Sequence, residues 1–236
     1  MDEWTALIDA KPLPGDPLAA NILTNPMIGL LAIEFASRRR MRLNGRVERA
    51  TDGRLLVHAQ QVYANCPKYI QARQIEGTPG TELNPSIVHV ATGLNQSQQQ
   101  WITQADTFFI ASAHPAGGAD ASHRGGHPGF IQMLDDSALL WPDYTGNMMF
   151  NTLGNIAVHP QSGLLFLDFA TGSTLQMTGQ AQIIWDEALV QPYPGAERLV
   201  RYSISQVIET AQRLPWCWEF MSYSPFHPEV SERGHE

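Results

Sequence analysis

The amino-acid sequence predicts a mainly β fold, an antiparallel β-barrel with short helices that is duplicated within one chain. Its 236 residues include 19 glycines and 16 prolines, which favours many turns and short strands over a helical bundle. In several segments apolar residues alternate with polar ones, as they do in half-buried strands. The chain also contains an internal repeat, which indicates two copies of one supersecondary unit.

The repeat relates residues 2–46 to residues 136–180 without a gap, at an offset of 134. The most similar part reads NPMIGLLAIEFASRRRMRLNG in the first copy and HPQSGLLFLDFATGSTLQMTG in the second. The shared Pro and Gly positions indicate the same backbone conformation in both copies, and the shared Leu-Leu and Phe-Ala positions indicate the same core packing. A later strand pair, 55–62 and 200–207, ends in Gln-Val in both copies. We therefore expect an abbreviated first unit at 1–77, a linker and helix at 78–104, a complete second unit at 105–218 and a C-terminal tail at 219–236.

The individual elements follow from local signals. Asp16 is suited to cap a helix, because its carboxylate can accept a hydrogen bond from a backbone N–H of the first turn. Pro17 is suited to the first helical position, because proline has no N–H to leave unpaired there. The segment 78–93, rich in Pro, Gly and polar residues, indicates a linker, and a helix is expected at 96–104. In the second unit we expect a helix from Asn147 to about Val158 and strands at 105–113, 129–134, 138–141, 163–169 and 174–185.

Composition and charge exclude several classes of protein. The net charge of −8 argues against a general binder of nucleic acid or anionic membranes, which needs clustered Lys and Arg. The longest apolar stretches, 29–33 and 163–167, are too short to span a bilayer. The first residues are acidic and lack an apolar signal core, so we expect a cytoplasmic protein with two reduced thiols, Cys66 and Cys217. Only 16% of residues are charged, so we expect a subunit or the second half of the chain to cover much of the surface.

The basic residues are unevenly distributed. Ten of the 15 Lys and Arg residues lie between 11 and 73, whereas 74–197 contains a single one, Arg124, among eleven Asp and Glu. Arg124 lies in the Gly-rich run Ser-His-Arg-Gly-Gly. It is either an ordinary surface or salt-bridged arginine or an anion anchor, since its planar donors fit phosphate and glycines let backbone N–H groups approach. The run Arg38, Arg39 and Arg40 is interpreted as a solvated turn in preference to a phosphate site.

Common catalytic motifs are absent from the sequence. There is no Gly-x-Gly-x-x-Gly, Walker A loop, His-Glu-x-x-His or Gly-x-Ser-x-Gly. His123 and His127 are separated by two glycines, so helical spacing does not bring them together, and no metal site is expected. Cys66 has no evident paired histidine and is interpreted as a packed residue in preference to a nucleophile.

Segments from both units carry a family resemblance. ADTFFIASAHPAGGADASHRGGHPGFIQMLDD, LLWPDYTGNMMFNTLGNIAVHPQSGLLFLDF and TLQMTGQAQIIW strongly resemble the pyridoxamine 5′-phosphate oxidase-like, FMN-binding split-barrel family. QVYANCPKYIQAR and ERLVRYSISQVIETAQRLPW look like pieces of its double-unit members, so the resemblance covers about 8–218. It implies a duplicated FMN-binding split barrel, with FMN in a groove between two barrels. Those barrels would belong to a homodimer or to one chain as an intrachain pseudo-dimer.

The resemblance also implies a set of cofactor-binding residues. By motif match, Ser122 and Arg124 contact the phosphate. Gln176 matches a strand glutamine that faces the flavin ring. The other matched positions are Tyr144, Thr145 and Asn147 in the strand-to-helix turn, Asn151 after it, and Lys68 from the other unit. Where the oxidases proper have an Arg-Lys pair, this chain has Met148 and Met149, and their basic tail is not recognisable, so the resemblance does not extend to pyridoxamine phosphate oxidation.

Two classes of function are compatible with these residues. The first is an FMN-dependent oxidoreductase acting on a small organic substrate, with NAD(P)H as a candidate donor. The second is a non-catalytic binding protein for a flavin or another planar cofactor, such as haem or a deazaflavin. A barrel that has lost cofactor binding is the third reading. The flavin would carry the redox chemistry, so no residue is expected to act as catalytic acid or base.

Overall fold

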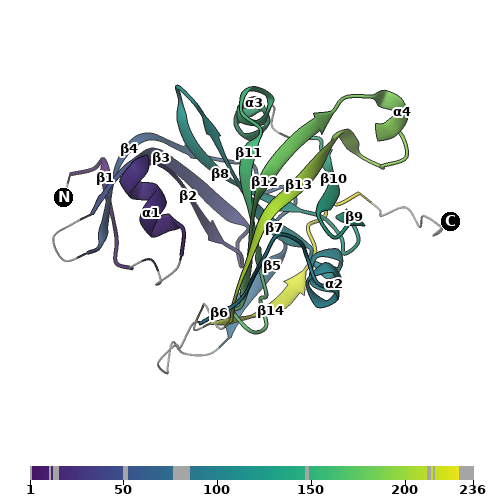
Figure 1. The fold of residues 1–236 in the computed structure, drawn as a ribbon, viewed down its shortest axis with the longest axis horizontal. Helices are drawn as coiled ribbons and strands as arrows, with labels where there is room; N and C mark the ends of the chain where they lie inside the picture. The colour runs from purple at the N-terminus through teal and green to yellow at the C-terminus, as the bar shows by residue number, and fades with distance from the viewer. Residues whose placement is uncertain are drawn as a thin grey trace.

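The computed structural model describes residues 2–10, 12, 16–49, 53–76, 86–146, 149–211, 214 and 216–228, and of residues 86–88 it describes the backbone alone. These residues confirm the predicted fold class, because most of them form antiparallel strands joined by short helices (Figure 1). A four-stranded and an eight-stranded sheet make up the two units, and a two-stranded ribbon joins parts of the chain that are far apart in sequence.

The first unit is an open sheet with the strand order β1-β4-β3-β2. Its core is small and consists of Ile22, Val47, Leu55 and Val57. The elements are β1 (Thr5–Ile8), α1 (Leu18–Thr24), β2 (Met27–Glu34), β3 (Arg39–Arg49) and β4 (Leu55–Ala64), followed by β5 (Ala72–Glu76), which pairs with β14 (Cys217–Ser222).

The second unit is the barrel, with the strand order β8-β7-β11-β12-β13-β10-β9 and β6 paired to β13. Its core is aromatic: the Phe108 ring lies 5.1 Å from the Trp141 ring and 5.3 Å from the Phe166 ring, measured between centroids. The strands are β6 (Ser86–Ala91), β7 (Thr107–His114), β8 (Gly118–Gly125), β9 (Gln132–Asp135), β10 (Ala138–Tyr144), β11 (Gln161–Leu167), β12 (Thr174–Ile184) and β13 (Ala196–Ala211), and the helices are α2 (Gln96–Gln104), α3 (Asn151–Val158) and α4 (Glu187–Val190).

The structure confirms the duplication in detail. The order β1-β4-β3-β2 recurs as β10-β13-β12-β11, and β2 and β11 begin 134 residues apart, at Met27 and Gln161. Each copy has a register shift at the same place, before Gly45 in the first and before Gly179 in the second. At both glycines a Cβ would overlap a carbonyl oxygen of the neighbouring strand, so both bulges require glycine.

The two units differ in the strands beside the repeat. In the second unit β7 pairs with β11, and β8 continues the sheet. Among the described residues no such pair flanks β2; instead β8 of the second unit packs against β2. A Cβ at Gly29 would lie 2.8 Å from Asp120 Cα and from Ala121 N, so this approach is close. The β7–β8 hairpin therefore joins the two units within one chain (Figure 1).

Several element boundaries differ from the sequence prediction. Part of the expected linker, Ser86–Ala91, is strand β6, and the expected tail begins within β14. The helix expected from Asn147 begins at Asn151, and Asn147 and Met148 lie outside the described residues. The Asp16 carboxylate does accept a hydrogen bond from the Leu18 N–H at 2.9 Å, but Pro17 precedes α1. The four regions of the chain remain a prediction.

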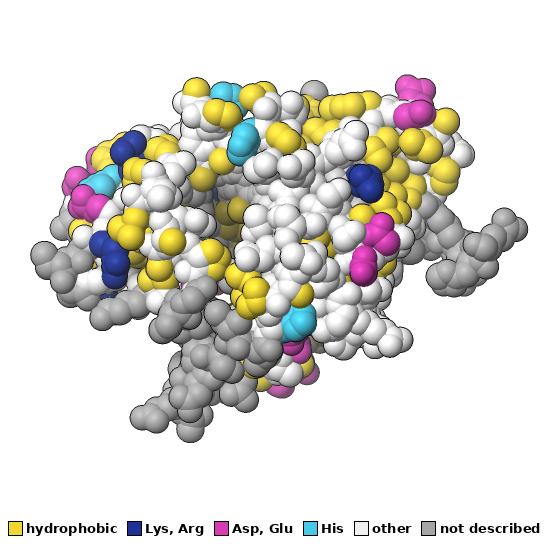
Figure 2. Space-filling view, in the orientation of Figure 1, with side chains coloured by type: hydrophobic (Ala, Val, Ile, Leu, Met, Phe, Trp, Pro, Cys, Tyr) yellow, Lys and Arg dark blue, Asp and Glu magenta, His cyan; other side chains and the backbone are white. Residues whose placement is uncertain are grey.

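The surface carries few charged side chains in the view of Figure 2, where backbone and uncharged, non-hydrophobic side chains cover most of the centre. Hydrophobic side chains gather at its upper right, around α4, where Trp185 is 62% exposed and Leu189 is 54% exposed. Of the helices formed by the described residues, none is both long and apolar enough to cross a membrane.

Candidate functional site

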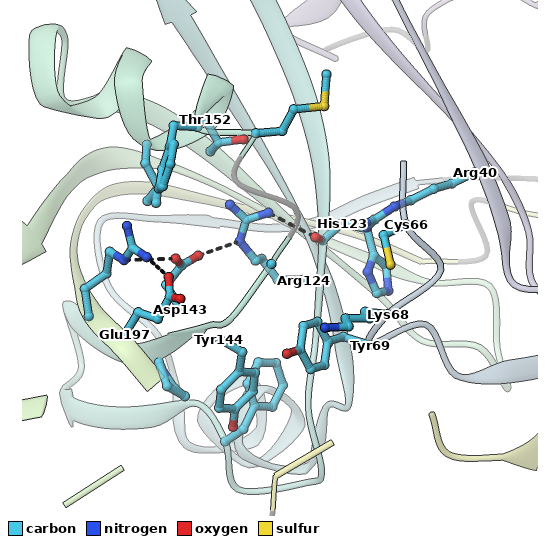
Figure 3. A pocket seen from close by; sticks show the side chains of 18 of the residues that line it. Arg40, Cys66, Lys68, Tyr69, His123, Arg124, Asp143, Tyr144, Thr152 and Glu197 are labelled. Atoms are coloured by element: carbon cyan, nitrogen blue, oxygen red, sulfur yellow. Dashed lines mark hydrogen bonds and ion pairs between the residues drawn. The ribbon is translucent and has the colours of Figure 1, made fainter. Parts of the chain in front are cut away.

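A cavity of about 110 Å³ lies where the two units meet, and both contribute to its walls (Figure 3). The first unit supplies Arg40 and Arg42 from β3 and the Cys66–Tyr69 segment that follows β4. The second unit supplies the end of β8, the end of β10 and the start of β13. Because β8 packs on the first unit, residues far apart in sequence converge there. The second unit's lining residues are His123, Arg124, Gly125, Phe130, Pro142, Asp143, Tyr144, Gly146, Met149, Phe150, Thr152, Leu153, Glu197 and Arg198.

Arg124 faces this cavity. Its Nη1 donates to Ser122 Oγ at 2.7 Å and to the His123 carbonyl at 3.0 Å, and its Nε lies 3.8 Å from Asp143 Oδ1 (Figure 3). The Arg124 side chain is 20% exposed. Arg124 is therefore both salt-bridged and placed at the crevice between the copies.

Two carboxylates balance the arginines of the second unit. Asp143 lies 3.3 Å from Arg198 Nε as well as beside Arg124, and Glu197 is ion-paired with Arg198 Nη2. Burial raises the pKa of Asp143, while the two guanidinium groups oppose that rise. Burial also lowers the pKa of Arg124, and Asp143 counteracts it. The second unit thus brings nearly compensated charges to the cavity.

Arg40 brings a charge without a partner. Its side chain makes no ion pair or hydrogen bond with any described residue, and its Nε is buried and unpartnered. Burial, with Arg42 and Arg124 nearby, lowers the pKa of Arg40 to about 10, so it stays charged at neutral pH. The interpretation of the arginine run as a solvated turn is therefore wrong for Arg40, although Arg39 is exposed. Arg38, in the turn at φ 56°, donates from Nε to the Ile70 carbonyl at 3.0 Å.

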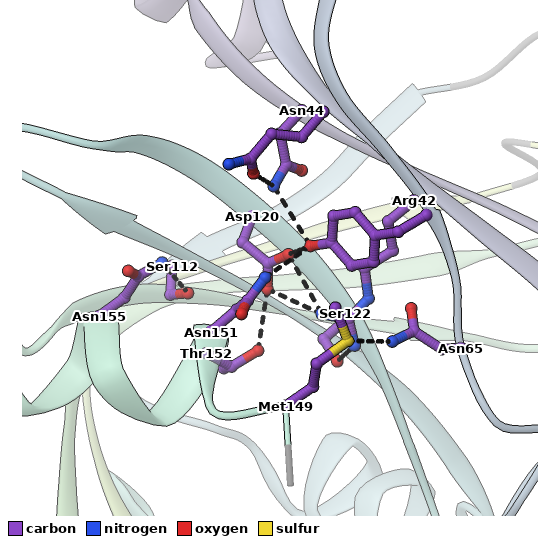
Figure 4. A network of polar contacts seen from close by, with 12 residues as sticks. Arg42, Asn44, Asn65, Ser112, Asp120, Ser122, Met149, Asn151, Thr152 and Asn155 are labelled. Carbon is purple, nitrogen blue, oxygen red and sulfur yellow. Dashed lines mark hydrogen bonds and ion pairs between the residues drawn. The ribbon is translucent and has the colours of Figure 1, made fainter. Parts of the chain in front are cut away.

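A buried polar network fixes β8 against the first unit (Figure 4). Arg42 Nη1 lies 3.2 Å from both oxygens of Asp120, and its Nη2 donates to Ser122 Oγ at 2.5 Å. The Tyr63 hydroxyl donates to Asp120 at 3.0 Å, and the Thr152 hydroxyl donates to it at 2.9 Å. Ser122 is fully buried and accepts from both Arg42 and Arg124, so it positions the arginines from behind the cavity wall.

His123 is a buried imidazole at the edge of the cavity. It is 3% exposed, and neither ring nitrogen has a hydrogen-bond partner. Burial, with Arg40 and Arg124 nearby, lowers the pKa of His123 well below 6.5. Half-buried His227 has a pKa lowered to about 4, chiefly by burial. Both rings are therefore neutral in the folded protein near neutral pH.

We expect the protein to lose stability as the pH falls below 6.5. The unfolded chain protonates His123 near pH 6.5, whereas the folded chain does not, so the unfolded state binds more protons in this range. His123 alone should lower the free energy of unfolding by about 1 kcal/mol between pH 6.5 and 5.5. Urea unfolding at pH 6.5 and at pH 5.5 measures this change in the free energy of unfolding. The slope should shrink in His123→Phe but not in Gln206→Ala, an exposed control without a titratable group; an equal slope in all three proteins would contradict the assignment.

The structure brings together three of the eight predicted site residues. Lys68, Arg124 and Tyr144 line the cavity, and the Tyr144 ring lies 5.4 Å from the ring of Tyr69. Thr145 is exposed, and its carbonyl accepts from the Tyr69 hydroxyl at 2.7 Å. The predicted residues that do not line the cavity are Ser122, Thr145, Asn151 and Gln176, and Asn147 lies outside the described residues. The Asn151 Nδ2 donates to the Tyr63 hydroxyl at 2.7 Å.

Gln176 illustrates how the repeat changes the site. It lies on β12, 134 positions after Arg42, so Arg42 is its equivalent in the first unit. The strand that contributes to this cavity is β3, the first unit's equivalent of β12, so Arg42 lines the cavity and Gln176 does not. Sequence reasoning missed Arg40, Arg42, Asp143 and Arg198. The repeat alignment could have identified Arg42, because it pairs Arg42 with Gln176, which was a predicted cofactor-binding residue.

Other reactive side chains are accounted for. Cys66 is half-buried and lines the cavity, whereas Cys217 is exposed and its Sγ lies 2.8 Å from the Ala170 carbonyl oxygen. Within the described part of the chain, no three His, Cys, Asp or Glu side chains are grouped as metal ligands would be.

Comparison with known proteins gives a family match and several structural neighbours. Residues 94–215, just over half of the chain, match the family model described as pyridoxamine 5′-phosphate oxidase. A putative pyridoxamine 5′-phosphate oxidase from Lactobacillus delbrueckii is 16% identical, with a TM-score of 0.41 over 50% of this chain and 94% of its own. Group A Streptococcus H111A HupZ is 12% identical, with a TM-score of 0.41 over 49% and 98%. A FAD-binding protein from Mesorhizobium loti is 13% identical, with a TM-score of 0.36 over 51% and 96%. No curated protein matches the chain.

Proposed function

The chain belongs to the pyridoxamine 5′-phosphate oxidase family, and from this premise we propose that it is a flavoprotein that binds FMN at the junction of its two units. We propose further that it is an FMN-dependent oxidoreductase acting on a small organic substrate. One observation carries the proposal: Arg124, the single cation between residues 74 and 197, lines a cavity between the two copies and does not point into bulk water.

The residues of the cavity suit an anionic, partly aromatic ligand. Five cations line it, against two carboxylates, Asp143 and Glu197, so the wall favours a phosphate. Aromatic and apolar side chains lie beside these charges, among them Tyr69, Tyr144 and Phe150. The cavity volume of about 110 Å³ is below the roughly 300–1,000 Å³ of small-molecule pockets. It therefore suits the phosphate end, while the flat ring would lie in the open part of the groove.

The residues of the site would act by binding and orientation. Bound flavin would supply hydride or electron transfer. Arg124, held by Ser122 and Asp143, would fix the phosphate with little loss of side-chain freedom, because its geometry is already set. The Tyr69 hydroxyl donates to the Thr145 carbonyl, which would hold the Tyr69 ring in place at one side of the cavity. No proton transfer is assigned to a side chain, since the flavin carries the redox step.

The proposal is tested on the purified full chain. We expect mass spectrometry of the small molecule released on denaturation to give FMN, and the holoprotein to show flavin absorbance that NADPH bleaches and a supplied acceptor restores. Bound flavin that no nicotinamide reduces would favour a non-catalytic carrier. A colourless protein that takes up no added FMN would contradict the flavin assignment.

Arg124→Ala should weaken FMN binding by about 1.5–3 kcal/mol, the range for a hydrogen bond to a charged group. The loss has two sources, because the substitution removes a donor and also leaves Asp143 with less compensation inside the cavity. Fluorescence titration with FMN measures it. Arg201→Ala, an exposed position on β13, is the control and should not change the affinity. Equal FMN affinity in the two variants would remove Arg124 from the site.

A further inference from the structure

The charges of the cavity are not shared equally between the two units. Arg124 and Arg198 are matched by Asp143 and Glu197 on the second unit itself. Arg42 is matched by Asp120, with which it forms a buried pair. Two cations then remain without a carboxylate, Arg40 and Lys68, and both come from the first unit.

Arg40 is held in an environment that lacks an anion. It lies on β3 in register with Ile33 of β2, so the sheet fixes its backbone. Strand alternation places Arg40 on the same face as Arg42 and opposite the exposed Arg39. Its charged neighbours at the cavity include Arg42 and Arg124, and a half-buried cation whose Nε is out of contact with water and has no counter-charge is costly. The free energy of this arrangement falls when an anion enters the cavity.

Lys68 is positioned by contacts from the C-terminal part of the chain. Its Nζ lies 5.5 Å from the centre of the Phe226 ring, a cation–π distance. The next residue, Tyr69, has φ 67°, and its backbone N–H donates to Ser224 Oγ at 3.2 Å. These contacts hold the segment against the cavity, while the Lys68 ammonium makes no hydrogen bond or ion pair with the described residues.

We propose that Arg40 and Lys68 together form an anion-binding pair in this site, and that with Arg124 they take the dianionic phosphate monoester of the ligand. The first unit then supplies half of the binding site, and the bound phosphate bridges the two units. This inference rests on the proposed function for the location of the ligand. The same chemistry could belong to the phosphate of FMN or to that of a phosphorylated substrate, and the experiment separates these sources.

The test uses the full chain with Arg40→Ala and Lys68→Ala, and Arg39→Ala as the matched control. Arg39 is the exposed neighbour of Arg40 on the same strand. Each protein is titrated with FMN, with riboflavin, which lacks the phosphate, and with inorganic phosphate, using flavin fluorescence and thermal unfolding. We expect Arg40→Ala and Lys68→Ala each to weaken FMN binding about 10- to 100-fold, with riboflavin binding unchanged. Arg39→Ala should behave like the wild type.

Thermal unfolding adds a readout that a structural role would not produce. Without ligand, Arg40→Ala should unfold at the same temperature as the wild type or higher, because an unpaired charge is removed. Inorganic phosphate should raise the unfolding temperature of the wild type in a concentration-dependent way and lose most of that effect in Arg40→Ala.

Each outcome supports or overturns the pair. FMN binding that is equal in Arg40→Ala, Lys68→Ala and Arg39→Ala would overturn it while leaving the flavin proposal intact. Phosphate protection that depends on Arg40, in a protein that binds no FMN, would support the pair for a phosphorylated substrate and overturn the flavin. Binding of none of the three ligands to the wild type would overturn both.

Discussion

Asp120→Ala should lower the free energy of unfolding by about 3–5 kcal/mol, the cost of breaking a buried ion pair from one side. Asp120 is 3% exposed and Arg42 is 5% exposed, so the guanidinium left behind has no water to replace its partner. The Tyr63 and Thr152 hydroxyls lose their acceptor as well. For a chain of this size the unfolding temperature should fall by roughly 6–20 °C, which calorimetry measures.

A second substitution separates the ion pair from general disruption. Arg42→Met removes the charge but keeps much of the volume, and in the double variant with Asp120→Ala no buried charge is stranded. The double variant should therefore be less destabilised than the sum of the two single variants. Glu219→Ala, at an exposed position of β14, is expected to change stability by no more than about 0.5 kcal/mol. A loss in Asp120→Ala no larger than this would contradict the role of the network.

Gly125→Ala should destabilise the protein by roughly 3 kcal/mol and weaken FMN binding at the same time. A Cβ at Gly125 would overlap the backbone carbonyl oxygen of Tyr69, and a backbone atom cannot move aside as a flexible side chain does. The overlap must push away the segment that carries Lys68, so both stability and anion binding suffer. Denaturant unfolding and FMN titration of the same preparation test the two effects.

The chain provides a glycine with the opposite expectation. Gly154 lies within α3, and a Cβ there would meet nothing within 4 Å. Gly154→Ala should therefore raise the free energy of unfolding by about 0.5–1 kcal/mol, because alanine favours the helix more than glycine. If Gly125→Ala were as stable as Gly154→Ala, the close approach of β8 to Tyr69 would be wrong.

Local signals predicted most of the fold. The helix expected at 96–104 is α2, and its start is explained by Asn95, whose side chain accepts from the Gln98 N–H in a capping box. Strand β6 was missed for a non-local reason. Its segment has the polar, Pro- and Gly-rich flanks of a loop, and it becomes a strand only because the 16-residue β13 offers it an edge at Val207–Ala211.

The candidate site was predicted mainly on the side of the second unit, with Lys68 as the one predicted residue from the first unit. The motif match drew nearly all site residues from the second unit, and the structure places Arg124 and Tyr144 at the cavity. A run of three arginines resembles a solvated turn, because sequence alone does not show which face of β3 meets β8. That contact depends on how the two units pack, which local patterning does not encode.

The equivalence of Arg42 and Gln176 has a consequence for how such a groove can change. When two identical subunits form a groove, one codon specifies the equivalent residue on both walls, and every mutation therefore changes both walls. Here two codons specify the matching positions, so one wall can gain a positive charge while its counterpart stays neutral. Fusing the copies into one polypeptide thereby frees each wall to be selected for its own task.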